Sequence, residues 1–137
     1  MNKVILVAHG KLAHEMKNSA EMIFGELKDF QTVEFLNGDG LQTLQEKIKE
    51  SMTDAANYLI LCDLFCGTPY NASCGLALEQ PDRKIEIVSG MSLPLVLEAA
   101  SMLENSQLSE IVTHLTTIPS QTVQAFSQQV IEDEEDF

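Results

Sequence analysis

The chain has 137 residues, a length that suits one domain with one hydrophobic core. Hydrophobic residues make up 45% of it and charged residues 21%, which is an ordinary soluble composition. The net charge of -13 argues against nucleic acid and anionic membranes as partners and favours a basic protein partner.

The distribution of apolar residues predicts strands that alternate with helices. The first run, Lys3 to Ala8, is β-branched or apolar almost throughout, which indicates a strand buried on both faces and central in a parallel sheet. Loop signals such as Asn37-Gly38-Asp39-Gly40 separate the later runs. In chain order we expect strands at 3–8, 31–36, 57–62 and 84–89, and helices at 12–27, 41–52, 69–78 and 95–103.

The last third of the chain is less regular. Ser109 to Ile118 suits either a strand, because it is rich in β-branched residues, or a helix with one apolar face. Pro119-Ser120-Gln121 opens a last expected helix that runs to about Ile131. We therefore expect a single domain over residues 1–131, followed by a solvated acidic tail at 132–137.

This alternation predicts a doubly wound α/β fold, with a mainly parallel four-stranded sheet and helices on both faces. Ligands bind such sheets outside the carboxyl ends of the strands, where the strand order reverses. The segments that follow the four expected strands are rich in glycine and small polar residues, and they predict a functional site at that edge. They are His9-Gly10, Asn37-Gly38-Asp39-Gly40, Asp63 to Thr68 and Gly90 to Pro94.

His9 and Asp63 are the candidate reactive pair. Neutral imidazole is a good nucleophile toward phosphorus, although a strand-end histidine can simply hydrogen-bond its neighbours. Asp63 follows an apolar strand, where burial of a carboxylate must be compensated, although an aspartate there can also cap a loop. If the first and third strands are adjacent, the carboxylate can hold one ring nitrogen and leave the other free to attack.

The loop after Asp63 leads into a helix start, with Thr68 able to cap and Pro69 at the first helical position. A helix N-terminus favours anions, so Thr68 and nearby backbone N–H groups are expected to hold phosphate oxygens. Phe65 either packs inside or, if exposed, docks a partner. Glycine-rich nucleotide motifs and a serine elbow are absent, which favours relay of a phosphoryl group between proteins without a cofactor.

The cysteines and the N-terminal sequence bear on the expected cellular location. Cys62, Cys66 and Cys74 are odd in number and lack a common zinc spacing, so we expect reduced thiols and no metal site. No apolar run could span a membrane, and Met1-Asn2-Lys3 leads into a strand without a signal-peptide pattern. The expected location is the cytoplasm.

Four stretches follow one another in the order of a known family and cover residues 1 to about 105. They are Leu6-Val7-Ala8-His9-Gly10, Phe35-Leu36-Asn37-Gly38-Asp39, Asp63-Leu64-Phe65-Cys66-Gly67-Thr68-Pro69-Tyr70-Asn71 and Ser89-Gly90-Met91-Ser92-Leu93-Pro94-Leu95. The sequence resembles the enzyme IIA domain of the mannose-type (mannose–fructose–sorbose) phosphotransferase system. The third stretch, Asp-x-aromatic-x-Gly-[Ser/Thr]-Pro-x-Asn, is the specific one.

The resemblance implies a bacterial cytoplasmic phosphocarrier and phosphotransferase. His9 would accept a phosphoryl group at Nε2 from phospho-HPr and pass it to enzyme IIB, which serves the membrane IIC and IID sugar permease. Asp63 would hold Nδ1, while Thr68 and the backbone amides of Phe65, Cys66 and Gly67 would stabilise the phosphate. Two alternatives share the fold: the phosphoryl-donor subunit of a dihydroxyacetone kinase and a non-catalytic regulatory domain.

The resemblance also implies homodimers that exchange a C-terminal strand, which would make Ser109 to Ile118 a fifth, antiparallel strand at the sheet edge. One position departs from the family, whose members usually have glycine where this chain has Cys66. If that position needs a positive φ, the cysteine is strained there.

Overall fold

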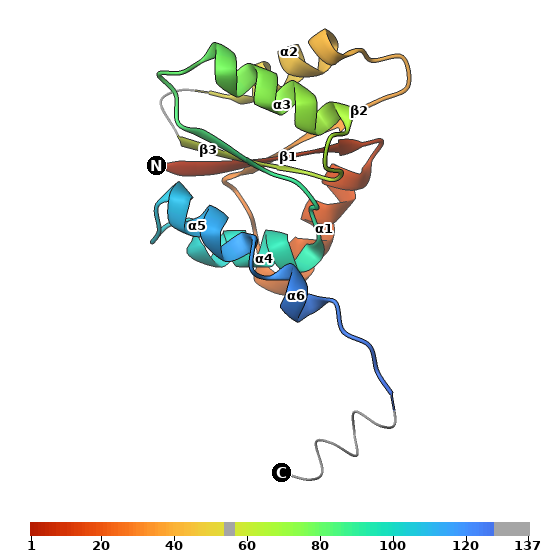
Figure 1. Cartoon of the computed structure of the whole chain (residues 1–137), viewed down its shortest axis with the longest axis vertical. Coiled ribbons are helices and arrows are strands. Elements are labelled where there is room, and N and C mark those ends of the chain that lie inside the picture. The colour runs from red at the N-terminus through yellow and green to blue at the C-terminus, as the bar shows by residue number, and fades with distance from the viewer. Residues whose placement is uncertain (54–56, 128–137) are drawn as a thin grey trace.

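The computed structural model describes residues 1–53 and 57–127, and it is a layered α/β structure with helices on both faces of a sheet (Figure 1). The four strands are β1 (Asn2–His9), β2 (Phe30–Phe35), β3 (Asn57–Cys62) and β4 (Ile85–Val88). All pair in parallel, in the order β2-β1-β3-β4. The predicted doubly wound fold is therefore confirmed, and the strand order reverses between β1 and β3.

The helices divide into two layers. Helices α1 (Leu12–Phe24), α4 (Leu93–Met102) and α5 (Leu108–Leu115) cover one face of the sheet, and α2 (Leu41–Ser51) and α3 (Thr68–Glu79) cover the other (Figure 1). This two-sided cover explains why strands in the middle of the sheet are apolar without alternation.

The side chains of strand β1 divide alternately between the two faces of the sheet. Val4, Leu6 and Ala8 lie in the core under α1, α4 and α5, whereas Ile5 and Val7 lie in the core under α2 and α3. All five side chains are fully buried. Successive strand residues point to opposite faces, so a strand between two helical layers must be apolar at every position.

The register brings the carboxyl ends of three strands level with one another. His9 pairs with Phe35 on β2, and Val7 pairs with Cys62, the last residue of β3. The residue after β3, Asp63, therefore lies beside the end of β1. The edge predicted to carry the site is the edge at which these segments meet.

The segment that could be a strand or a helix is a helix. Over residues 109–118, α5 and a following turn replace the fifth, antiparallel strand, and that part of the prediction is wrong within the described chain. Three apolar residues at helical spacing, Leu108, Ile111 and Leu115, are buried against the sheet. A capping box between Gln107 and Glu110 also stabilises the first turn of the helix.

The last predicted helix is too long. Helix α6 covers only Pro119–Thr122 and buries none of its residues. The chain then leaves the body in an extended conformation, with Val123 and Phe126 exposed (Figure 1). A short helix with no apolar face to bury is not stable, which explains the early end. Residues 128–131 of that helix and the acidic tail at 132–137 lie outside the described residues.

Within the described ranges, no helix has the length and apolar character needed to cross a membrane.

Candidate active site

His9 and Asp63 form a hydrogen-bonded pair at the carboxyl edge of the sheet. His9 is the last residue of β1 and its side chain is 49% exposed, whereas the Asp63 side chain is 11% exposed. The ring Nδ1 lies 2.8 Å from Oδ2 of Asp63, and the main-chain N–H of His9 donates to the same oxygen at 3.0 Å. The adjacency of β1 and β3 brings together two residues 54 positions apart in the chain.

These contacts assign the tautomer of the imidazole. Oδ2 of Asp63 accepts a main-chain N–H, and an ionised carboxylate can only accept. Nδ1 of His9 therefore carries the proton of the 2.8 Å bond, and Nε2 of the neutral ring keeps its lone pair. The arrangement provides a nucleophile at Nε2.

The second oxygen of Asp63 has an unusual environment. Oδ1 is buried, and within the described chain it has no hydrogen-bond partner. An unpaired buried carboxylate oxygen costs free energy of folding. An aspartate at position 63 therefore does not favour stability. Its contact with His9 explains its presence better than a structural role does.

Two further residues lie beside the imidazole. The ring of Phe35 packs against it edge to face, with centroids 5.4 Å apart and planes at 80°. Gly67 is close to the ring on the loop, since a Cβ added there would be in ordinary contact with Cε1 of His9, at 3.5 Å, and tightly placed at 3.3 Å from the carbonyl oxygen of Leu64. The loop after β3 therefore passes near the ring.

The loop of residues 64–67 is a tight turn closed by the N–H of Gly67 and the carbonyl of Leu64, 3.1 Å apart. Cys66 has a φ of 63°, the left-handed conformation that side chains disfavour. The conditional prediction about this residue is thus met, because glycine would adopt this φ without strain. The side chain of Asn71 donates to the Cys66 carbonyl at 3.1 Å and supports the turn.

Thr68 is the first residue of α3, and Gly67 occupies the N-cap without a side-chain cap. The prediction that Thr68 caps the helix is therefore wrong by one residue, and Pro69 takes the second helical position. The turn at residues 64–67 ends at Gly67, so Gly67 rather than Thr68 is the residue immediately before the helix. The first N–H groups of a helix have no carbonyl partner within it, so this end of α3 can receive an anion.

Phe65 is 65% exposed. Its ring makes an edge-to-face contact with the ring of Tyr70, with centroids 5.1 Å apart, and with no other aromatic ring of the described residues. Other large apolar side chains are also exposed on the loops and helix starts that follow β1, β2 and β3. They are Leu12, Leu36, Leu41 and Leu64. The edge of the sheet around His9 thus exposes several large apolar side chains.

Side-chain hydrogen bonds that no sequence pattern predicted hold the loop after β2 at this edge. Asp39 accepts the N–H of Leu36 at 2.9 Å and pairs with Lys47 at 2.6 Å, and Lys47 also donates to the carbonyl of Glu34. The hydrogen bond from Lys47 lowers the pKa of the Asp39 carboxyl. These bonds tie the end of β2 to α2. The sequence offered only a turn signal for this loop.

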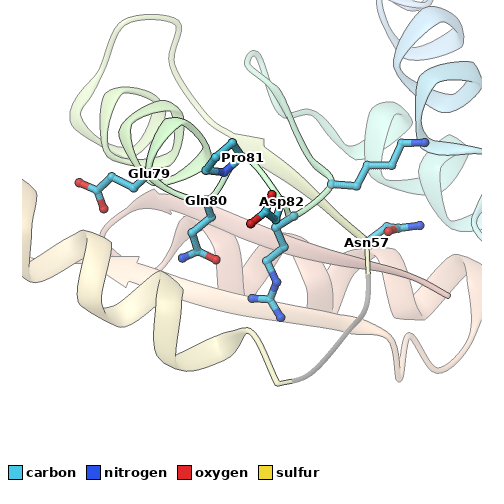
Figure 2. Close-up of a pocket in the computed structure, with 7 residues that line it drawn as sticks. Asn57, Glu79, Gln80, Pro81 and Asp82 are labelled. Carbon is cyan, nitrogen blue, oxygen red and sulfur yellow. The ribbon is translucent and has the colours of Figure 1, made fainter.

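A cavity of about 540 Å³ lies at the opposite end of the sheet (Figure 2). Its lining includes Asn57, the first residue of β3, and residues 79–84, which precede β4. It is separate from His9 and Asp63. Among the described residues, no group of three or more His, Cys, Asp and Glu side chains is placed to hold a metal ion.

Comparison with known proteins agrees with the geometry. Residues 3–132 match the family EIIA-man, described as the fructose IIA component of the PTS system. The chain belongs to this family. It is an EIIA component of the mannose type, and the family is part of a sugar phosphotransferase system, so the resemblance described above is confirmed.

Named relatives agree with this assignment. The chain is 38% identical to a sorbose-specific EIIA component of Lacticaseibacillus casei, with 93% of each protein covered. It is 36% identical to a fructose-specific EIIA component of Bacillus subtilis, covering 93% of this chain and 88% of the relative. A mannose/sorbose-specific IIA subunit from Enterococcus faecalis superposes with a TM-score of 0.82, at 31% identity and with 92% of this chain and 95% of that chain covered.

Proposed function

We propose that this EIIA protein carries a phosphoryl group on His9, taking it from phospho-HPr and passing it to the IIB subunit of a sugar permease. The observation that carries the proposal is the 2.8 Å bond between Nδ1 of His9 and Asp63, which leaves a lone pair on Nε2 of a side chain that is 49% exposed. The dihydroxyacetone kinase alternative is less well supported, because the relatives at 38% and 36% identity are sugar-specific EIIA components.

The chemical step is an in-line transfer between two imidazoles. The Nε2 lone pair of His9 forms a bond to phosphorus, while the bond from phosphorus to the donor histidine breaks and returns its electron pair to the donor ring. The proton on Nδ1 stays with His9. As Nε2 gains the phosphoryl group the ring becomes positive, and the carboxylate of Asp63 stabilises that charge.

The start of α3 supplies the donors for the phosphate. We assign this role to the hydroxyl and N–H of Thr68 and to the backbone of Phe65, Cys66 and Gly67. The support is the close approach of Gly67 to Cε1 of His9 and the unpaired N–H groups expected at a helix N-terminus. Neutral donors suit a carrier, because an excess of positive charge would hold the phosphate too strongly for onward transfer.

The surroundings of His9 suit protein partners. Exposed apolar side chains, among them Leu64 and Phe65, lie on the loop beside it, and such residues often anchor protein interfaces. The net charge of -13 would speed encounter with a basic partner. The two curated relatives are named for different sugars, which agrees with selection of the sugar by the membrane subunits.

We also propose a homodimer in which a C-terminal strand is exchanged, although not the segment first expected. Strand β4 is at the edge of the sheet and pairs only with β3 among the described residues. Beyond α6 the chain extends away from its own body with Val123 and Phe126 exposed (Figure 1). An extended segment and an open strand edge are complementary, and pairing would satisfy the backbone groups of β4.

The test is phosphorylation in a defined mixture. The protein would be incubated with phosphoenolpyruvate, enzyme I and HPr, and acid-labile phosphate on it would be measured by mass spectrometry. We expect one phosphate on the wild type and on His14→Gln, an exposed control histidine on α1, and none on His9→Gln. No labelling of folded wild-type protein, or labelling of the His9→Gln variant, would refute the proposal. Sedimentation tests the dimer separately.

A further inference from the structure

We propose that Phe35 is a positioning residue for His9, holding the plane of the imidazole so that Nε2 faces an incoming phosphorus atom. This inference rests on the proposed function, because it concerns how the ring is prepared for reaction. Phe35 is half-buried and ends β2, directly beside His9 in the register of the sheet. Its ring meets the imidazole edge to face at 5.4 Å.

The bond to Asp63 cannot orient the ring by itself. It restrains one atom, Nδ1, and the imidazole can still tilt about that atom, since the side chain is 49% exposed. A second contact away from Nδ1 is needed to define the plane. Phe35 supplies an edge-to-face contact, and such pairs are attractive in addition to the apolar area that they bury.

Phe35 is itself firmly held, as a positioning residue must be. Its carbonyl accepts the N–H of Gly10 at 2.8 Å, which joins the ends of β1 and β2. Its side chain packs against the core under α2 and α3. The residue after it, Leu36, is fastened through its N–H to the carboxylate of Asp39, which is paired with Lys47. Movement of Phe35 away from His9 would disturb all of these contacts.

A purely structural role for Phe35 predicts a different result, and Val33 provides the control. Val33 lies two residues earlier on β2 and belongs to the same core, but it pairs with Val7 rather than His9. Truncation of either residue removes apolar packing from the same region. Only the Phe35 variant removes a contact with the imidazole.

The experiment compares Phe35→Leu, Phe35→Met, Phe35→Tyr and Val33→Ala with the wild type. Imidazole nitrogen signals report the tautomer and the mobility of the His9 ring in the isolated protein, and rapid mixing with phospho-HPr reports the rate of one transfer. For the Leu and Met variants we expect a more mobile ring, seen as broadened imidazole signals with the Nδ1–H tautomer retained, and a transfer about three- to tenfold slower. We expect wild-type values for Phe35→Tyr, and for Val33→Ala a lower melting temperature with both readouts unchanged.

Wild-type ring mobility and transfer rate in Phe35→Leu or Phe35→Met would overturn the inference, as would equal changes in Val33→Ala. The Met variant, close in volume to phenylalanine, guards against misfolding of the Leu variant. The nitrogen signals need no partner protein. If wild-type protein fails to take phosphate but Phe35 still controls the mobility of the imidazole, the proposed function has failed and the positioning of His9 has not.

Discussion

A single oxygen of Asp63 binds His9 twice, through the ring Nδ1 at 2.8 Å and through the main-chain N–H at 3.0 Å. The main-chain bond fixes the carboxylate relative to the end of β1, and the ring bond then fixes the imidazole relative to the carboxylate. The other oxygen is buried without a partner in the described chain.

Asp63→Asn is expected to slow phosphorylation of His9 by roughly 10²- to 10⁴-fold, because an amide can donate to Nδ1 and place the proton on Nε2. If the amide NH2 takes the place of Oδ2, the main-chain N–H of His9 loses its acceptor, so the melting temperature should fall modestly although the fold survives. Rapid-mixing kinetics and thermal unfolding measure the two effects. Asp82→Asn, at the far end of the sheet, is the control and should leave the rate unchanged. An unaltered rate in Asp63→Asn would remove this residue from the mechanism.

Cys66→Gly should stabilise the protein by about 0.5–1 kcal/mol. Glycine relieves the strain of a φ of 63°, which outweighs the extra freedom that it gives the unfolded chain. Cys66→Ala is the matched control, because it removes the thiol but keeps the Cβ and hence the strain. Urea unfolding measures both variants. A gain in the alanine variant equal to that in the glycine variant would show that the thiol, rather than the backbone, causes the effect.

Gly67→Ala should slow phosphorylation about two- to fivefold. The added methyl group would be in ordinary contact with Cε1 of His9, at 3.5 Å, but would lie only 3.3 Å from the Leu64 carbonyl oxygen, so the turn must move by a few tenths of an ångström beside the ring. Gly40→Ala is the control. Gly40 is also a helix N-cap with a negative φ, yet a Cβ there meets nothing within 4 Å. Equal rates for the two alanine variants would contradict the proposed role of Gly67.

The pair of Asp39 and Lys47 makes stability depend on pH. The folded-state pKa of Asp39 is lowered, chiefly by the hydrogen bond from Lys47. A lowered pKa contributes stability that is present above the ordinary aspartate value near 3.8 and is lost as the pH falls through the folded value. Urea unfolding between pH 2 and 6 should therefore show a shallower acid decline for Asp39→Asn than for wild type. Identical slopes would mean that the pair contributes nothing in solution.

Local sequence was sufficient to place most secondary structure and the segments that carry the site. Strand β3 matches the predicted range 57–62, and each of the other strands differs by one residue at each end. His9 and Asp63 could be recognised because each follows a run buried on both faces. Local signals conflicted in residues 109–118, where the β-branched composition favours a strand and the spacing of apolar residues favours a helix. The sequence therefore could not predict the structure of this segment. It is a helix because three apolar residues pack against the sheet.

By itself, the amino-acid sequence determined the alternation of strands and helices, the mostly apolar strands of a two-sided sheet and the loops at its carboxyl edge, because these depend on residue type and spacing over a few turns. Only the tertiary structure decided which loops meet. The order β2-β1-β3-β4 places Asp63 at His9, and the register of β1 with β2 places Phe35 against the same ring. Pairing of strands distant in the chain is set by packing of the whole core, which no local pattern records.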